Sequence, residues 1–217
     1  MRHPHGLRAA AAAAAGIPIG TSMEGGFFAG YISHTANGVA THLLIVAPAA
    51  TGATGTGYTL TTNKLWKTTT TTTAGTTSPY DGAANSANMN DASHPAAQFC
   101  ETLSIGGYTD WYLPARYELD IAYENLKPTT NSNNGSWGVN VYSVPARASN
   151  RAAFVPTQTS VAAFQSGGVE AFPVNDHWSS TEDSSTNAWE LRFDIGVQLS
   201  DTKNNTFRVR AFRKVAV

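Results

Sequence analysis

Alternating apolar and polar residues mark the end of the chain as β-structure. From 189 to 197 every second residue is apolar, which is the pattern of a strand with one buried face. Residues 206–215 alternate in the same way, and the polar segment 200–205 between them predicts a turn. We therefore expect a C-terminal hairpin whose inward face includes Leu191 and Ile195.

The first half of the chain predicts further strands. Glycines border the aromatic segment 25–33, and a continuous apolar run at 41–49 fits a strand buried on both faces. A run of threonines, Thr68 to Thr73, favours extended backbone, so we expect a strand there that leads into a loop.

Two helices are expected between these strands. The first lies within 93–107, with Pro95 at its first position and Gly106 just past its end. The second begins at Pro114 and ends before Pro128, with apolar residues at helical spacing along one face. Residues 128–170 are rich in Asn, Ser and Gly and predict a long irregular loop, either functional or in contact with other subunits. This order of elements predicts an α+β domain.

The outward face of the predicted hairpin carries an unusual mixture of side chains. Glu190, Arg192 and Asp194 alternate with core residues, and Arg208 follows on the returning strand. Exposed ion pairs contribute only about 0–1 kcal/mol, so stability gives little reason for this set. The face is either a recognition surface or a plain solvated hairpin.

Composition excludes several classes of function. Charged residues make up 13% of the chain and the net charge is -1, so neither nucleic-acid binding nor attraction to an anionic membrane is expected. No apolar stretch reaches the length of a membrane span. The single cysteine, Cys100, cannot form an intrachain disulfide and is expected to be a buried small residue on the first helix.

Catalytic and metal-binding signatures are weak. The six histidines are scattered, and no Gly-rich phosphate loop precedes a helix. Glu182 and Asp183 lie beside serines and could bind a cation such as Ca²⁺, but adjacent acids more often solvate a turn. We therefore expect no enzyme activity, no cofactor and no metal.

The N-terminal segment is alanine-rich and follows a few basic residues. Alanine is too weakly hydrophobic for a convincing signal peptide, and an isolated helix of this length is marginal in water. We expect residues 1–23 to form an arm that anchors the chain to another protein, and residues 24–217 to form the domain. A frayed tail is the alternative.

Several spaced motifs resemble a known family. The motifs are "DWYLP" opening a helix with "EL", then "HWSSTE", "NAWELRF" and a closing "VRAFRKV". Together they resemble the C-type-lectin-fold domains related to the C-terminal domain of a Legionella collagen-like adhesin. The resemblance implies a C-type-lectin-like α+β fold, with two helices flanking a small antiparallel sheet and long loops. It also implies that the N- and C-terminal strands lie close together.

The same tail pattern resembles the variable proteins of diversity-generating retroelements, including a phage tail protein that binds host receptors. In such proteins fixed scaffold residues alternate with diversified ligand-binding residues. The resemblance implies a scaffold of Trp111, Trp178, Ala188, Trp189, Phe193, Gly196 (at a bulge), Val209, Arg210 and Ala211. The implied ligand-binding residues are Asp183, Glu190, Arg192, Asp194, Val197, Leu199, Asp201, Asn204, Asn205 and Arg208.

These observations favour a phage virion surface protein, a fibre or decoration subunit, that binds a host-surface glycan or protein through a lectin-fold module. The arm would contact other virion proteins. By analogy with viral fibres we expect a homotrimer. A purely structural virion subunit and a bacterial surface adhesin are the alternatives.

Overall fold

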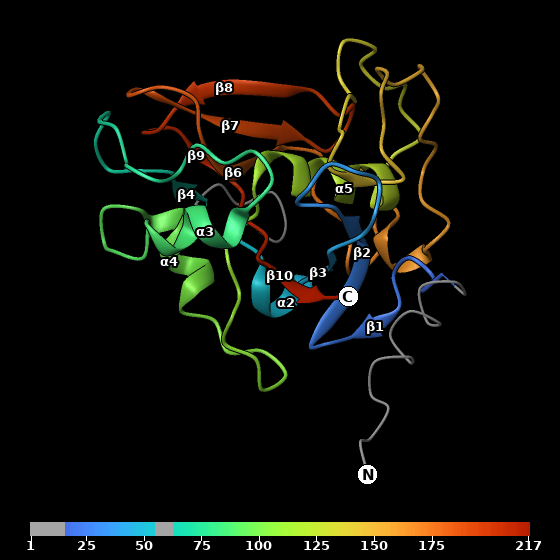
Figure 1. The fold of residues 1–217 in the computed structure, drawn as a ribbon, viewed down its shortest axis with the longest axis horizontal. Coiled ribbons are helices and arrows are strands. Elements are labelled where there is room, and N and C mark those ends of the chain that lie inside the picture. Colours follow the sequence, from blue (N-terminus) through green and yellow to red (C-terminus); the bar gives the residue numbers. More distant parts are fainter. Residues whose placement is uncertain (1–15, 55–62) are drawn as a thin grey trace.

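The computed structural model describes residues 16–54 and 63–217, and it shows an α+β domain. Its largest sheet has five strands, with the order β1 (Ser22–Met23), β2 (Gly26–Ile32), β3 (His42–Val46) and β10 (Phe212–Ala216). The short strand β5 (Ser143–Val144) pairs with the end of β2. The last strand of the chain thus pairs antiparallel with β3, one of the first (Figure 1).

The apolar run in β3 is continuous because both faces of this sheet are buried. Leu43 and Ile45 belong to one hydrophobic cluster, which also contains Trp66, Trp111 and Trp178. Leu44 and Val46 face a second cluster, built around α5 (Arg116–Leu126). The buried strand expected at 41–49 is therefore confirmed.

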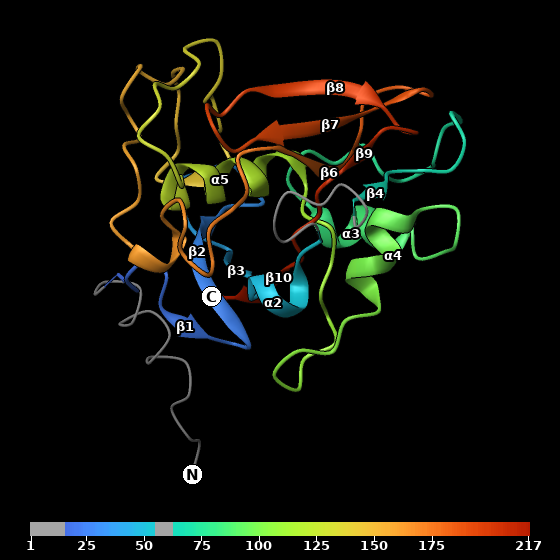
Figure 2. The same ribbon diagram turned by 180° about the vertical axis from the view of Figure 1, so that it is seen from behind.

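A second sheet covers the other side of α5. It contains β6 (Asp176–Glu182), β7 (Asn187–Arg192) and β8 (Gln198–Thr202), in that order. Views from the two sides place α5 between this sheet and β2 (Figures 1 and 2). The ring of Tyr123 on α5 meets Phe193 at 5.8 Å, which fixes the helix against the end of β7.

The predicted C-terminal hairpin is wrong. The strand does not continue to residue 199 but turns back after β7, so β7 pairs with β8. Gly196 makes this turn possible, because its φ is +71° and a Cβ there would lie 2.4 Å from the Tyr123 ring. The returning segment separates instead into β9 (Thr206–Phe207), which pairs with β4 (Lys64–Leu65), and β10.

The helices are close to the expected positions. α4 (Pro95–Glu101) begins at Pro95 as expected but ends before Gly106. α5 begins at Arg116, because Ala115 is the N-cap and keeps an extended backbone after Pro114. The Glu118 carboxylate accepts the Ala115 N–H at 2.7 Å and so satisfies one free donor of this helix end. The short helices α2 (Ala49–Gly52) and α3 (Gly82–Ala87) were not predicted.

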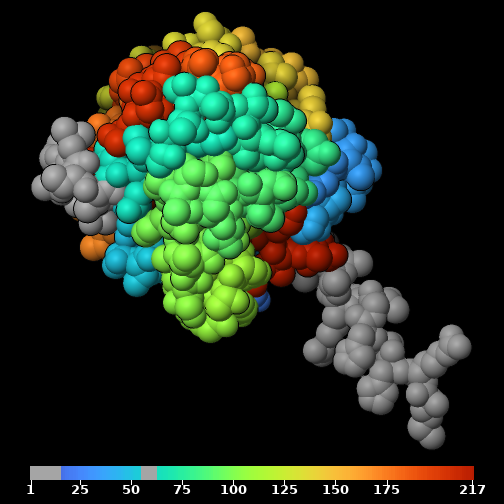
Figure 3. All heavy atoms as spheres, turned by 90° about the vertical axis from the view of Figure 1, so that its left-hand side faces the viewer, coloured from blue at the N-terminus to red at the C-terminus, as the bar shows by residue number. Residues whose placement is uncertain are grey.

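The threonine run is not a strand. After the two-residue β4, its backbone bends around the ammonium group of Lys67, which donates to the carbonyls of Thr71 and Thr72 at 3.0 Å. The segment from β4 to α4 covers one side of the molecule next to β7 and β8 (Figure 3). The long loop at 128–170 is confirmed as largely irregular, with only β5 and a short 3-10 helix, Ala162–Phe164.

The predicted boundary between arm and domain falls inside the fold. Residues 1–15 lie outside the described part of the chain. Ile17 and Ile19 already pack against the hydrophobic clusters, and β1 pairs with β2. Residues 17–23 therefore lie against the domain, and anchoring of the chain to another protein through its N-terminal segment stays a prediction. Within residues 16–54 and 63–217, no helix has the length and apolar character needed to cross a membrane.

Candidate recognition face and the polar networks around it

One face of the β6–β7–β8 sheet gathers acidic side chains. Residues paired directly across a sheet point to the same side, so Asp176 and Arg192 share a face, as do Glu190 and Leu199. Asp201 is on this side too, and Asp194 follows in the turn after β7. We call these six residues the acidic face: Asp176, Glu190, Arg192, Asp194, Leu199 and Asp201. The face turns away from α5.

Glu190 is buried at the centre of the acidic face. Its exposed fraction is only 2%. Burial raises the pKa of Glu190 to about 9, with further increases from Asp176, Asp201 and Asp194 that Arg192 opposes only in part. Glu190 lies on the side of β7 that the sequence predicts, but its side chain is buried rather than exposed.

Carboxylate oxygens in the acidic face lack hydrogen-bond donors. Glu190 Oε2, Asp176 Oδ1 and Asp194 Oδ1 are shielded from solvent, and each has no hydrogen-bond partner among the described residues. Arg192 is the nearby cation: its Nη2 lies 2.8 Å from Asp194 Oδ2, and its Nε lies 3.5 Å from Asp176 Oδ1. Buried acceptors without donors cost about 1–3 kcal/mol each, so this face is incomplete as it stands.

Some sequence-predicted ligand residues lie elsewhere. Arg208 forms a parallel β-bridge with His177, and His177 is paired with Leu191 on β7. Leu191 packs in the cluster around α5, so the Arg208 side chain points to the α5 side of the sheet. The expectation that Arg208 projects beside Glu190 is wrong, because the chain leaves β8 for other strands. Val197 is buried as part of the turn.

Two further predicted residues border the acidic face, and Asp183 lies outside it. Asp183 is exposed and accepts a hydrogen bond from Ser200, which is paired with Trp189 on the opposite face. Asn204 and Asn205 are exposed in the turn after β8, and Asn205 donates to Asp201 at 2.8 Å. The structure thus brings together Glu190, Arg192, Asp194, Leu199 and Asp201, with the two asparagines at their edge.

The predicted scaffold residues are buried, with one exception. Trp111, Trp178, Ala188, Phe193, Val209, Arg210 and Ala211 are all buried, and Gly196 is enclosed against Tyr123. Arg210 is neutralised by Glu170 at 2.7 Å. Trp189 is only partly buried, and the Arg116 guanidinium lies 3.6 Å from its ring centroid.

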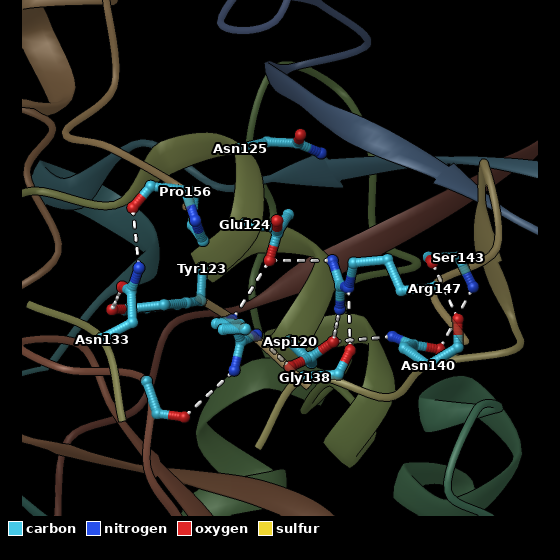
Figure 4. A network of polar contacts seen from close by, with 12 residues as sticks. Asp120, Tyr123, Glu124, Asn125, Asn133, Gly138, Asn140, Ser143, Arg147 and Pro156 are labelled. Atoms are coloured by element: carbon cyan, nitrogen blue, oxygen red, sulfur yellow. Dashed lines mark hydrogen bonds and ion pairs between the residues drawn. The ribbon is translucent and has the colours of Figure 1, made fainter. Parts of the chain in front are cut away.

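A fully buried carboxylate that the sequence did not reveal anchors the long loop. Asp120 on α5 forms ion pairs with Arg147 and Arg151 and accepts hydrogen bonds from Asn140 and Gln198. Figure 4 shows Asp120 with Arg147 and Asn140. Burial lowers the pKa of Arg147 to about 9, and the neighbouring Arg151 adds to this decrease. The signal in the sequence was a pair of arginines in an Asn/Ser/Gly segment whose other charged residue is Glu170.

A second contact closes the same loop at its base. The Tyr123 hydroxyl donates to Asn133 at 2.6 Å, and the Asn133 amide donates to the Pro156 carbonyl at 2.9 Å (Figure 4). The long irregular segment is therefore held to α5 by side chains, in addition to the pairing of β5 with β2.

Glu182 and Asp183 do not form a shared cation site. Glu182 is buried and forms an ion pair with Lys203, whereas Asp183 is exposed. Lys203 has an exposed fraction of 0%, and its ammonium lies 4.9 Å from the Trp66 ring. In the described part of the chain, no group of three or more His, Cys, Asp or Glu residues is placed to hold a metal ion.

The fold and the acidic face define a small α+β module with the features of a binding domain. The chain belongs to the family described as the Lcl C-terminal domain, whose sequence profile matches residues 55–213. This confirms the resemblance to the C-terminal domain of the Legionella collagen-like adhesin and makes the protein an adhesin-like module. The comparison with curated proteins found no match.

Proposed function

We propose that this domain is a surface recognition module that binds a cationic group of its partner through the acidic face. The observation that carries the proposal is the set of shielded carboxylate oxygens on Glu190, Asp176 and Asp194 that have no hydrogen-bond donor among the described residues. A lysine or arginine side chain of a partner protein supplies the missing donors. Its positive charge complements the acids around Glu190, whose own carboxyl is neutral at physiological pH because burial raises its pKa to about 9.

The exposed rim of the acidic face supports this proposal. The side chain of Arg192 is 41% exposed, and Leu199 is 46% exposed beside the buried Glu190. Membership in an adhesin-domain family is consistent with this role.

The finer assignment follows the sequence expectations. We propose a C-type-lectin-like topology, supported by the pairing of the first and last long strands through β3. We propose display on a phage virion, with residues 1–15 in contact with other virion proteins. We also propose that the protein is not an enzyme. The Cys100 thiol is buried and burial raises its pKa, so it remains protonated.

The test is binding of the full chain to peptide arrays in which Lys- and Arg-containing sequences are matched with sequences carrying Gln instead. The test variant is Asp194→Asn with Asp201→Asn. The matched control is Asp183→Asn, an exposed acid outside the acidic face. We expect selective binding of the cationic peptides, reduced at least tenfold in the test variant and unchanged in the control. Equal losses in both variants, or no preference for cationic peptides, would contradict the proposal.

A structural role is the second candidate, because exposed apolar residues gather in the long loop. These residues are Val139, Val141, Phe154, Val155 and Val169. Large apolar side chains left exposed are candidates for protein–protein contacts. We propose that this loop forms the contacts of a homotrimer. Light scattering of the purified chain tests this: a trimer that dissociates in Phe154→Ser supports it, and a monomer at micromolar concentration refutes it.

A further inference from the structure

A row of partly buried aromatic side chains brings separate segments of the chain together at the start of α5. Tyr142 stacks on Tyr80 and on Tyr117, with 4.3 Å and 5.7 Å between the ring centroids. Trp137 on the long loop meets Trp189 on β7 edge to face at 6.2 Å. With the arginine that lies among them, these residues form what we call the aromatic row: Tyr80, Tyr142, Tyr117, Arg116, Trp137 and Trp189.

Arg116 joins the tyrosines of the row to the tryptophans. Its guanidinium lies 3.6 Å from the ring centroid of Trp189 and 5.4 Å from that of Trp137. The Tyr117 ring is 5.5 Å away, and Nε donates to the Gln198 side chain. Stacking on aromatic rings and one hydrogen bond therefore fix the orientation of this guanidinium.

The charge of Arg116 is not balanced by an ion pair. Within the described part of the chain, its two Nη atoms have no hydrogen-bond partner, and neither atom is shielded from solvent. Asp183 attracts Arg116 only from beyond ion-pair distance. Ion pairs are formed, in contrast, by Arg147, Arg151, Arg192, Arg210 and Arg213.

The two tryptophans of the row also have uncommitted donors. Trp66, Trp111 and Trp178 are 0% exposed, and each donates its indole N–H to a backbone carbonyl, at 2.8, 3.1 and 2.9 Å. For Trp137 and Trp189, no acceptor of this N–H lies among the described residues, and neither nitrogen is shielded from solvent. The row therefore offers hydrogen-bond donors beside its ring faces.

A segment in the polyproline II conformation complements this combination of groups. Its backbone makes no internal hydrogen bonds, so its carbonyls are free to accept, and proline has no N–H that needs an acceptor in return. Surfaces lined by aromatic rings commonly bind such segments. A saccharide also presents hydroxyl donors, whereas the uncommitted nitrogen atoms of the row are all donors. The chemistry of the row thus favours a peptide ligand.

We propose that the aromatic row binds a proline-rich segment of a partner protein in the polyproline II conformation, with an acidic residue of that segment at Arg116. A guanidinium binds a carboxylate in a bidentate manner, and Trp, Tyr and Arg are enriched where binding energy is concentrated. Trp189 and Glu190 are consecutive on β7, so their side chains point to opposite faces of the sheet. The site therefore does not depend on the function proposed for the acidic face.

The test measures binding of fluorescein-labelled peptides to the full chain by fluorescence anisotropy. The first peptide is a run of prolines with one central glutamate. In the second peptide lysine replaces the glutamate, and in the third peptide alanines replace the prolines. We expect the first peptide to bind at least tenfold more tightly than the alanine peptide and at least threefold more tightly than the lysine peptide.

Two variants and a matched control locate the site. Trp137→Ala removes the ring and the donor, whereas Trp137→Phe keeps a ring and removes the donor alone, so it serves even if the alanine variant fails to fold. The control is Tyr108→Ala, because Tyr108 is also partly buried and lies 3.8 Å from a guanidinium, that of the ion-paired Arg213. We expect binding of the first peptide to fall at least tenfold in Trp137→Ala and at least threefold in Trp137→Phe, with the control unchanged.

Several results would overturn the proposal. These are equal binding of the proline and alanine peptides, no binding at millimolar concentration, and full binding by both Trp137 variants. Displacement of the first peptide by cellohexaose at a lower concentration than by the unlabelled peptide would make the row a saccharide site instead. A Trp137 variant that changes the oligomeric state in light scattering but still binds the peptide would make the row a subunit contact.

Discussion

Replacing Lys203 with methionine tests how the buried ion pair contributes to stability. The ammonium of Lys203 donates to the carbonyls of Thr71 at 3.0 Å and Ser185 at 2.9 Å, and it forms an ion pair with Glu182. Methionine keeps most of the volume but removes the charge. It leaves the Glu182 carboxylate, whose side chain is 3% exposed, without its cation.

The expected cost follows from that burial. Removing one partner of a buried ion pair destabilises a protein by about 3–5 kcal/mol. For a chain of 150–250 residues, 1 kcal/mol corresponds to about 2–4 °C in Tm, so Lys203→Met should lower Tm by roughly 6–20 °C. Urea unfolding at pH 7, followed by fluorescence and far-UV circular dichroism, gives the free energy of unfolding.

A double variant and a control make this test sharp. Glu182→Met combined with Lys203→Met should recover most of the loss, because no buried charge is left alone. Lys64→Met, on a partly exposed lysine, should change the free energy of unfolding by only about 0.5 kcal/mol. A loss below about 1 kcal/mol for Lys203→Met that disappears in 1 M salt would mean that solvent screens the pair, and the reasoning would fail.

Three further predictions concern stability. Glu190→Gln should stabilise the protein at pH 8 but have little effect at pH 4. The pKa of Glu190 rises from 4.5 to about 9 on folding, so the free energy of unfolding of the wild type falls as pH increases between these values. Parallel curves of unfolding free energy against pH for variant and wild type would contradict this. Trp178→Ala should cost about 3–5 kcal/mol, and Trp189→Ala clearly less since Trp189 is only partly buried; equal losses in urea unfolding would show that Trp189 is a core residue. Gly196→Ala should lower the free energy of unfolding by about 2–5 kcal/mol, because the left-handed backbone and the close Tyr123 ring both oppose a Cβ. An unchanged midpoint of urea unfolding would argue against this turn.

The sequence predicted those parts of the fold in which local pattern and burial agree. The apolar run in β3 is continuous because this strand lies between two hydrophobic clusters. Pro95 begins α4 because the proline ring presets a helical φ angle. Alternation also placed Leu191 and Phe193 correctly in the core. These features can be predicted without knowing which distant segments of the chain they contact.

Predictions failed where tertiary contacts decide the path of the chain. Alternation from 189 to 197 could not reveal that Gly196 reverses the strand. A glycine is needed there because the backbone is left-handed and because Tyr123 approaches from α5, and alternation indicates neither. The position of Arg208 depends on pairing with β6 rather than β8, and alternation does not specify the partner strand. The burial of Lys203 and Asp120 likewise depends on contacts far along the chain.

The pairing of β10 with β3 has a mechanical consequence. The five residues of β10 are paired with His42–Val46, and Arg213 on this strand contacts Asp110 and Glu24. A pull along β10 loads these backbone hydrogen bonds in shear, so they share the force and must break together. A pull across the strand would open them one at a time. An adhesin-like module tensioned along this strand should therefore withstand larger forces than one peeled from its edge.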